Sequence, residues 1–171
     1  MLSKKQRTVT IDFTNAALDI RTLFMRVNIA IEEALGDMMT TGTIMFYGAT
    51  KWEQFMANAD VKAAYRNWEA SSQLMGDARM PFEYGGIHHE RYRGTGLVKI
   101  EPTEAYAVPL GVPEMFKVFY APADYTETVN QLGQPYYAKA EPMKFGKGFE
   151  LEAQTNPLAL NAMPHAVIKI N

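Results

Sequence analysis

All nine prolines of this 171-residue chain, and eight of its twelve glycines, follow Met80. Proline fixes φ and lacks a backbone N–H, so it interrupts helices and is confined to turns and strand edges. The chain before Met80 can therefore form long helices, whereas the chain after it must consist of short strands and turns. This asymmetry predicts an α+β protein, in which a mixed sheet is flanked by helices.

One helical pattern occupies residues 14–35. Apolar side chains recur there every three or four positions, with Thr14 or Asn15 as the expected cap and Gly36 as the expected stop. The stripe consists of Ile20, Phe24, Val27, Ile31 and Leu35. We expect one amphipathic helix that buries this stripe.

A strand pattern and a second helical pattern follow. The β-branched and aromatic run 43–47 is typical of a buried strand, and Gly48 ends it. Residues 50–53 have the form of a capping box, which predicts a helix start. A break is expected near Asp60, which could cap a second segment.

After Met80, apolar residues form short runs or alternate with polar ones, which is the strand periodicity. Gly85 and Gly86 suggest a tight turn or a bulge between the first two runs. The expected strands are 82–84, 87–92, 105–108, 115–120, 149–153 and 167–170.

Charge and composition exclude several classes of protein. The net charge is −2 without a basic stripe, which argues against a dedicated nucleic-acid binder. The absence of cysteine excludes disulfides and thiolate chemistry and fits synthesis in a reducing cytoplasm. No apolar run approaches the roughly 20 residues that cross a bilayer, so we expect no membrane partner.

The sequence His88-His89-Glu90 is the one cluster of metal-type ligands. Adjacent residues on a strand point to opposite faces, so the two histidines cannot share a metal on regular backbone. We therefore expect surface or interface histidines on a strand, and no metal, cofactor or catalytic residue. A small ligand-binding or metal-dependent domain that uses these three residues stays open as the alternative.

A second candidate surface is aromatic and basic. It would consist of Tyr120, Tyr125, Tyr136, Tyr137 and Lys139 with Arg91, Tyr92 and Arg93. Such a set can stack on single-stranded nucleic acid, but aromatic residues and arginine are also enriched in protein–protein interfaces. We favour a subunit interface that includes Tyr125, Tyr136, Tyr137, Lys139, Arg91 and Arg93. The Pro-, Gly- and Tyr-rich segments 102–113 and 124–142 are expected to be its contact loops.

Several segments follow one another in a fixed order: 116–125, Val129-Asn130, Gly133, Pro135, 137–139 and 148–158. In this order and spacing they resemble the closing region of lambda-type major capsid proteins, the protein E family of tailed phages. Upstream, Phe46, Trp52, Phe55, Val61-Lys62, 84–86 and 92–94 follow the order of the same family's axial domain. The resemblance spans most of residues 43–171.

The resemblance implies the tailed-phage major capsid (Hong Kong 97-like) fold. Residues 43–171 would be an axial-type domain with C-terminal strands, and residues 1–42 a helical connector or a remnant of the peripheral domain. Family members carry an N-terminal arm, an extended loop and a long spine helix before this region, so we expect this chain to be a fragment, a truncated prophage gene product or a separately expressed part.

The function that the resemblance implies is structural. The chain would be a structural subunit of an icosahedral bacteriophage or prophage shell that forms by self-association, made in the host cytoplasm and located in the virion. Scaffold, portal and decoration proteins are further partners that the family implies. A further hypothesis is that the chain is a fragment that assembles together with intact subunits and blocks their assembly.

Overall fold

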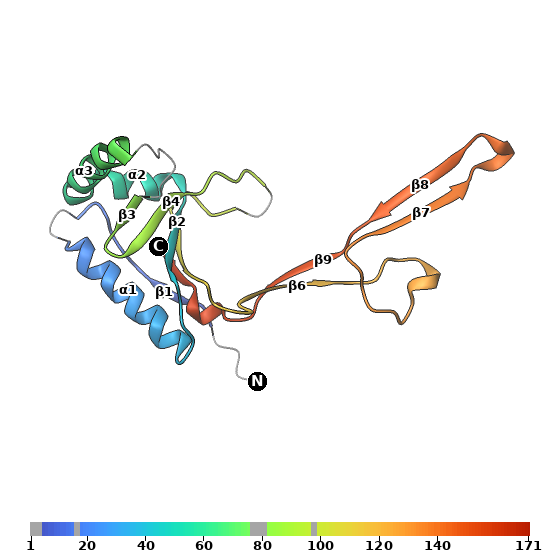
Figure 1. Ribbon diagram of the computed structural model, residues 1–171, viewed down its shortest axis with the longest axis horizontal. Helices are drawn as coiled ribbons and strands as arrows, with labels where there is room; N and C mark the ends of the chain where they lie inside the picture. Colours follow the sequence, from blue (N-terminus) through green and yellow to red (C-terminus); the bar gives the residue numbers. More distant parts are fainter. Residues whose placement is uncertain (1–4, 16–17, 76–81, 97–98) are drawn as a thin grey trace. The chain divides into compact units, whose positions relative to one another are not determined.

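The computed structural model describes residues 5–15, 18–75, 82–96 and 99–171. The chain divides into two compact units (Figure 1). The first unit comprises Met1–Pro113 and Met163–Asn171, and the second comprises Glu114–Ala162. The second unit is therefore an insertion between two strands of the first.

The first unit is built on a six-stranded mixed sheet. Its strand order is β1 (Arg7–Val9), β10 (Ile168–Ile170), β5 (Ala105–Leu110), β2 (Gly42–Tyr47), β4 (Ile87–Arg91) and β3 (Phe82–Tyr84). The pairs β1–β10 and β2–β4 are parallel and the other three pairs are antiparallel. The predicted α+β class with a mixed sheet is confirmed.

One face of this sheet carries the core. Strand register aligns Ile168, Ala107, Met45, His89 and Phe82 in a row across five strands. All five side chains are buried, with exposed fractions of 4% or less. The alternate positions of β2 and β5 are only half-buried, which is the period-two pattern of a sheet with one core face.

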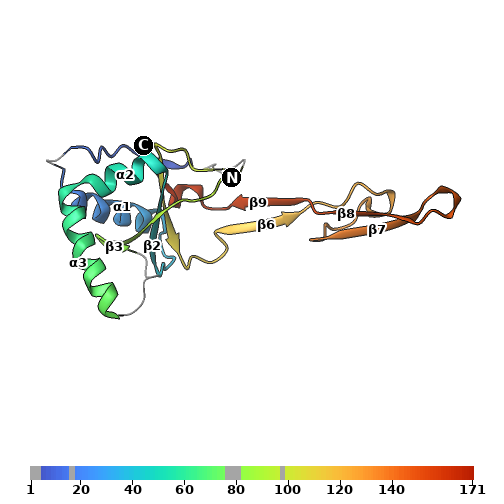
Figure 2. The same ribbon diagram turned by 90° about the horizontal axis from the view of Figure 1, so that it is seen from above.

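Helices α1 (Ile20–Leu35), α2 (Ala49–Ala57) and α3 (Ala59–Met75) lie together on one side of the sheet (Figure 2). All five residues of the predicted stripe of α1 are buried, and Gly36 ends the helix with a φ of 63°. The expected cap at Thr14 or Asn15 is wrong. Asp19 caps α1, because its carboxylate accepts a hydrogen bond from the Thr22 amide.

The start of α2 also differs from the prediction. No capping box forms: α2 begins at Ala49, and its cap position is Gly48, which makes no side-chain cap hydrogen bond. The predicted break after α2 is confirmed, although Asn58 caps there in place of Asp60. The Asn58 side chain accepts a hydrogen bond from the Asp60 amide at 3.0 Å.

Phe55 of α2 is the centre of the core between the helices and the sheet. Its ring is fully buried and lies 4.7 Å from the ring of His89 and 5.0 Å from that of Tyr47, both stacked. Phe24 of α1 lies 5.9 Å away. Aromatic side chains from two helices and two strands thus fix how the helices pack on the sheet.

The second unit contains two separate two-stranded ladders. Strand β6 (Phe116–Tyr120) pairs with β9 (Pro157–Asn161), and β7 (Tyr137–Pro142) pairs with β8 (Phe149–Gln154), both antiparallel. Residues 121–136 join β6 to β7 and contain a short 3₁₀ helix, Thr126–Thr128. The Asn156 side-chain amide donates a hydrogen bond to the Pro122 carbonyl at 3.1 Å, and the Thr155 hydroxyl donates one to the Pro135 carbonyl at 2.7 Å. These two bonds hold the 121–136 segment against the residues between β8 and β9.

All seven predicted strands, 43–47 among them as β2, are confirmed within one or two residues, and β1, β7 and β9 were not predicted. The expected contact loops are partly wrong, because 105–110 is strand β5 inside the sheet and 137–142 is strand β7. Among the described residues, no helix combines the length and apolar character needed to cross a bilayer. The division of the chain into 1–42 and 43–171 stays a prediction.

Candidate functional site

His88 and His89 point to opposite faces of the sheet, as expected for neighbours on a strand. His89 is 2% exposed, whereas His88 is half-buried on the other face and Glu90 is exposed. The expectation of a surface or interface histidine is wrong for His89. Its neighbours Met45 on β2 and Phe82 on β3 place it in the core row.

Two hydrogen bonds determine the tautomer of His89. Its Nε2 lies 2.9 Å from the Tyr84 carbonyl oxygen, which can only accept, so Nε2 carries the hydrogen. Nδ1 then accepts from the Tyr47 hydroxyl at 2.8 Å. Burial lowers the pKa of His89 from 6.5 to about 4, so the ring is neutral at physiological pH. His89 therefore ties β2, β3 and β4 together.

This geometry does not support a metal site shared by His88, His89 and Glu90. Both ring nitrogens of His89 are already hydrogen-bonded to protein atoms. Within the ranges that the structure describes, no group of three or more His, Cys, Asp or Glu side chains is arranged to hold a metal ion.

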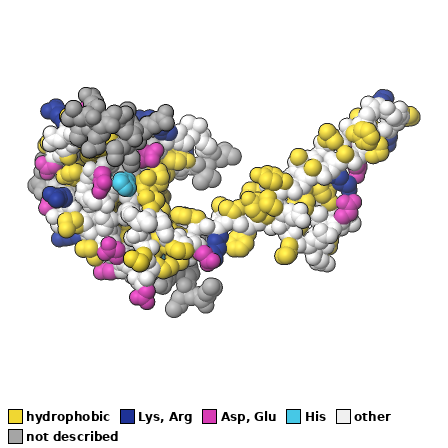
Figure 3. Space-filling model, in the orientation of Figure 1, with side chains coloured by type: hydrophobic (Ala, Val, Ile, Leu, Met, Phe, Trp, Pro, Cys, Tyr) yellow, Lys and Arg dark blue, Asp and Glu magenta, His cyan; other side chains and the backbone are white. Residues whose placement is uncertain are grey.

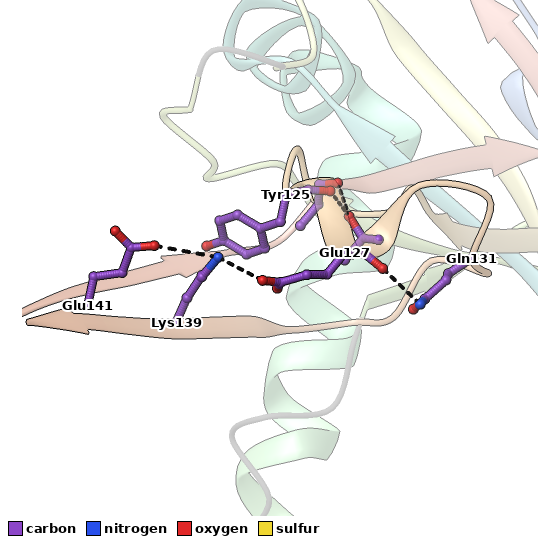
Figure 4. Close-up of polar contacts among 7 residues, drawn as sticks. Tyr125, Glu127, Gln131, Lys139 and Glu141 are labelled. Atoms are coloured by element: carbon purple, nitrogen blue, oxygen red, sulfur yellow. Dashed lines mark hydrogen bonds and ion pairs between the residues drawn. The ribbon is translucent and has the colours of Figure 1, made fainter.

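Four of the predicted interface residues lie in the second unit, and two of these four form an intrachain cluster (Figure 4). Lys139 Nζ lies 3.1 Å from a Glu127 carboxylate oxygen, 3.5 Å from Glu141 and 5.2 Å from the centre of the Tyr125 ring. The hydrogen bond to Glu127 raises the pKa of Lys139. The cluster connects the 121–136 segment to β7, and its exposed ion pairs contribute little to stability.

The adjacent tyrosines differ in their surroundings. Tyr136 is 80% exposed, whereas Tyr137 is half-buried and its hydroxyl accepts a hydrogen bond from the Gln134 amide at 2.8 Å. Tyr136 is thus available for contact with another molecule, and Tyr137 has a structural role within the unit.

Arg91 and Arg93 belong to the first unit, at the end of β4 and just after it. Both are exposed. The predicted aromatic and basic set is therefore divided between two units, and the contact of its members with another subunit stays a prediction.

The β7–β8 ladder has one polar and one apolar face, which the sequence reasoning missed. Residues paired directly across an antiparallel ladder share a face. The polar face consists of Tyr137, Lys139, Glu141, Glu150, Glu152 and Gln154. The apolar face consists of Ala138, Ala140, Pro142, Phe149, Leu151 and Ala153. The alternation of both segments in the sequence would have predicted it.

The apolar face of the β7–β8 ladder is open to solvent in the described chain. Phe149 and Leu151 are 71% and 78% exposed. The β6–β9 ladder is similar, since Phe116 on one face and Leu158 on the other are 62% and 61% exposed. Figure 3 shows hydrophobic side chains along the length of the second unit. Such surfaces are typical of interaction sites.

Comparison with known proteins points to one family. The family model described as phage major capsid protein E matches residues 2–171. No curated protein matches the chain.

Three solved structures extend the comparison. One is described as a prophage capsid protein of Escherichia coli CFT073, and it aligns at 14% identity and a TM-score of 0.53 over 85% of this chain and 46% of its own. A virus-like particle from Pyrococcus furiosus aligns at 8% identity and 0.44, over 99% and 57%. A phage-related protein of Bordetella bronchiseptica RB50 aligns at 9% identity and 0.47, over 98% and 57%. The first shares the fold, and this chain spans about half the length of all three.

Proposed function

The chain belongs to the phage major capsid protein E family, and from this we propose that it is a structural subunit that associates with copies of itself in a viral shell. Its role is to hold neighbours at fixed geometry and not to catalyse a reaction. The proposed location is the virion, after synthesis in the cytoplasm of the bacterial host.

The observation that supports self-association best is the lack of a core in the second unit. Met115, Ala123 and Thr128 are its buried residues, whereas its strands carry large apolar side chains that are half or more exposed. A two-stranded ladder is at most marginally stable alone in water. The second unit therefore fits a part that is completed by neighbouring molecules.

Shells form when one subunit repeats the same contacts around symmetry axes. Each contact can be weak, because many contacts per subunit act together and weak ones let errors dissociate. The extended surface of exposed apolar side chains on the second unit fits this requirement. The net charge of −2 also fits a shell whose inner surface does not bind packaged DNA tightly.

Within this proposal, Tyr125, Tyr136, Tyr137, Lys139, Arg91 and Arg93 remain candidate interface residues. Tyr136 is the strongest of them, since it is 80% exposed. Residues 43–171 would be the axial-type domain and 1–42 a connector or peripheral remnant. Scaffold, portal and decoration proteins are further proposed partners.

Mass measurement in solution, combined with electron microscopy over a concentration series, tests the proposal. We expect species larger than the monomer, including rings or sheets, whose fraction rises with concentration. A strict monomer at every concentration would contradict self-association by this chain.

A further inference from the structure

The apolar face of the β7–β8 ladder contains no charged side chain. All four charged residues of the two strands, Lys139, Glu141, Glu150 and Glu152, lie on the opposite face. Strict alternation of this kind is the pattern of a ladder that buries one face and leaves the other in water. The sequence of the hairpin is thus adapted to a partner on its apolar face.

The described part of the chain supplies no such partner. The smaller members of the face are exposed like the larger ones, since Ala138, Ala140 and Ala153 are all exposed. The Tyr125 and Glu127 contacts with Lys139 are made on the polar face. The intrachain contacts therefore hold the hairpin from one side and leave the apolar face free.

Side-chain size changes along the apolar face. At the base of the hairpin Ala138 pairs with Ala153, in the middle Ala140 pairs with Leu151, and near the tip Pro142 pairs with Phe149. The face is thus small at one end and bulky at the other. Well-packed layers place large residues of one layer against small residues of the other.

We propose that this face packs against the same face of a second copy, with the two hairpins running in opposite directions. A two-fold axis across the strands then places the bulky Phe149 end of each hairpin over the Ala153 end of the other. It also brings Ala140 and Leu151 each near its own copy, because this pair lies in the middle of the face. The inference rests on the proposed self-association and assigns one of its contacts.

A second copy fits this face for two further reasons. Two uncharged faces approach without like-charge repulsion, and the acidic polar faces point outward to solvent. Six residues per copy bury less than the roughly 1,200 Å² in total that marks the small end of stable interfaces. The contact alone is therefore weak, as a repeated shell contact should be.

Site-specific cross-linking tests the arrangement, because the chain has no cysteine. Packed sheets lie about 10 Å apart, too far for a disulfide, so a short bismaleimide is the appropriate reagent. Ala140→Cys in the full chain should give a cross-linked dimer. Glu150→Cys is the matched control, since it is exposed on the same ladder but faces the other way.

A second pair of variants measures the contribution of the face to association. Leu151→Glu should weaken association about tenfold or more, because it buries a charge in the contact. Ile29→Glu is its control, since it adds the same charge at an apolar residue that is 51% exposed on α1, outside the hairpin and outside the predicted contact loops. Added to Ala140→Cys, Leu151→Glu should also remove the cross-link.

The outcomes separate this inference from the proposed function. Selective cross-linking through Ala140→Cys supports both. If the chain associates but Ala140→Cys cross-links no more than Glu150→Cys, the assignment of this face to a second copy is overturned. The face would then have a different partner, and self-association would still stand. Only the cysteine-free chain remaining a monomer at all concentrations would contradict both.

Discussion

His89 is the polar residue on which the core of the first unit depends. It stacks on Phe55, accepts a hydrogen bond from Tyr47 and donates one to the Tyr84 carbonyl. A neutral imidazole satisfies all of these contacts. A protonated ring could no longer accept from Tyr47, so this hydrogen bond would have to reverse, and the ring would place a charge among aromatic side chains, which is unfavourable.

The stability of the first unit should therefore depend on pH through His89. Its pKa is about 4 in the folded chain against an ordinary value of 6.5, so between these pH values the unfolded chain binds a proton that the folded chain does not. The free energy of unfolding should fall by up to about 3 kcal/mol as the pH drops from 6.5 to 4.

Chemical denaturation at a series of pH values measures this effect. His89→Gln should be less stable at neutral pH and show a shallower loss of stability over the same window. His88→Gln is the matched control, because its side chain is 38% exposed on the other face. Equal pH slopes in His89→Gln and the unsubstituted chain would contradict the role of His89.

At the scale of elements, the turn between β3 and β4 packs against α1. Gly85 and Gly86 have φ of 61° and 77°, which disfavour any other residue. A Cβ on Gly85 would lie 3.0 Å from Phe24 Cβ, whereas a Cβ on Gly86 would meet only the Asn28 side-chain nitrogen at 3.4 Å. The turn thus approaches α1 most closely at Gly85.

Alanine substitutions should separate backbone strain from this close approach. Gly86→Ala should cost about 1 kcal/mol of unfolding free energy through its positive φ. Gly85→Ala should cost about 1 to 2 kcal/mol more, because α1 must shift. Urea denaturation of both variants measures the difference, and equal losses would show that α1 does not depend on this turn.

Sequence periodicity predicted the elements of the first unit well, because its helices and strands bury one face against a core. The stripe of α1 and the stop at Gly36 are examples. The caps at Asp19 and Asn58 were missed, since several residues near each start can accept the same amide hydrogen bond.

The second unit was harder to predict from the sequence. Strand β9 (Pro157–Asn161) is apolar on both faces and begins with a proline, so it lacks the alternation that identifies a strand. Strand β7 does alternate, but its tyrosine and proline content favoured a contact loop. The apolar face of the β7–β8 ladder was missed for the same reason. The interface prediction instead chose Tyr137 and Lys139, which lie on the polar face.

At the scale of the whole molecule, the two units differ in how they are stabilised. The first has a six-stranded sheet, helices on one side and a continuous aromatic core. The second has two paired strands in each of two ladders and few buried side chains. We infer that the first unit folds on its own contacts and that the second is completed by neighbouring copies.

Hydrogen–deuterium exchange over a concentration series tests this inference most directly. Amides of β2 and β5 should be protected at every concentration, because they lie in the centre of the sheet. Amides of β7 and β8 should exchange fast in dilute solution and become protected as the chain associates. Exchange in β7 and β8 that does not change while the measured mass rises would contradict the account.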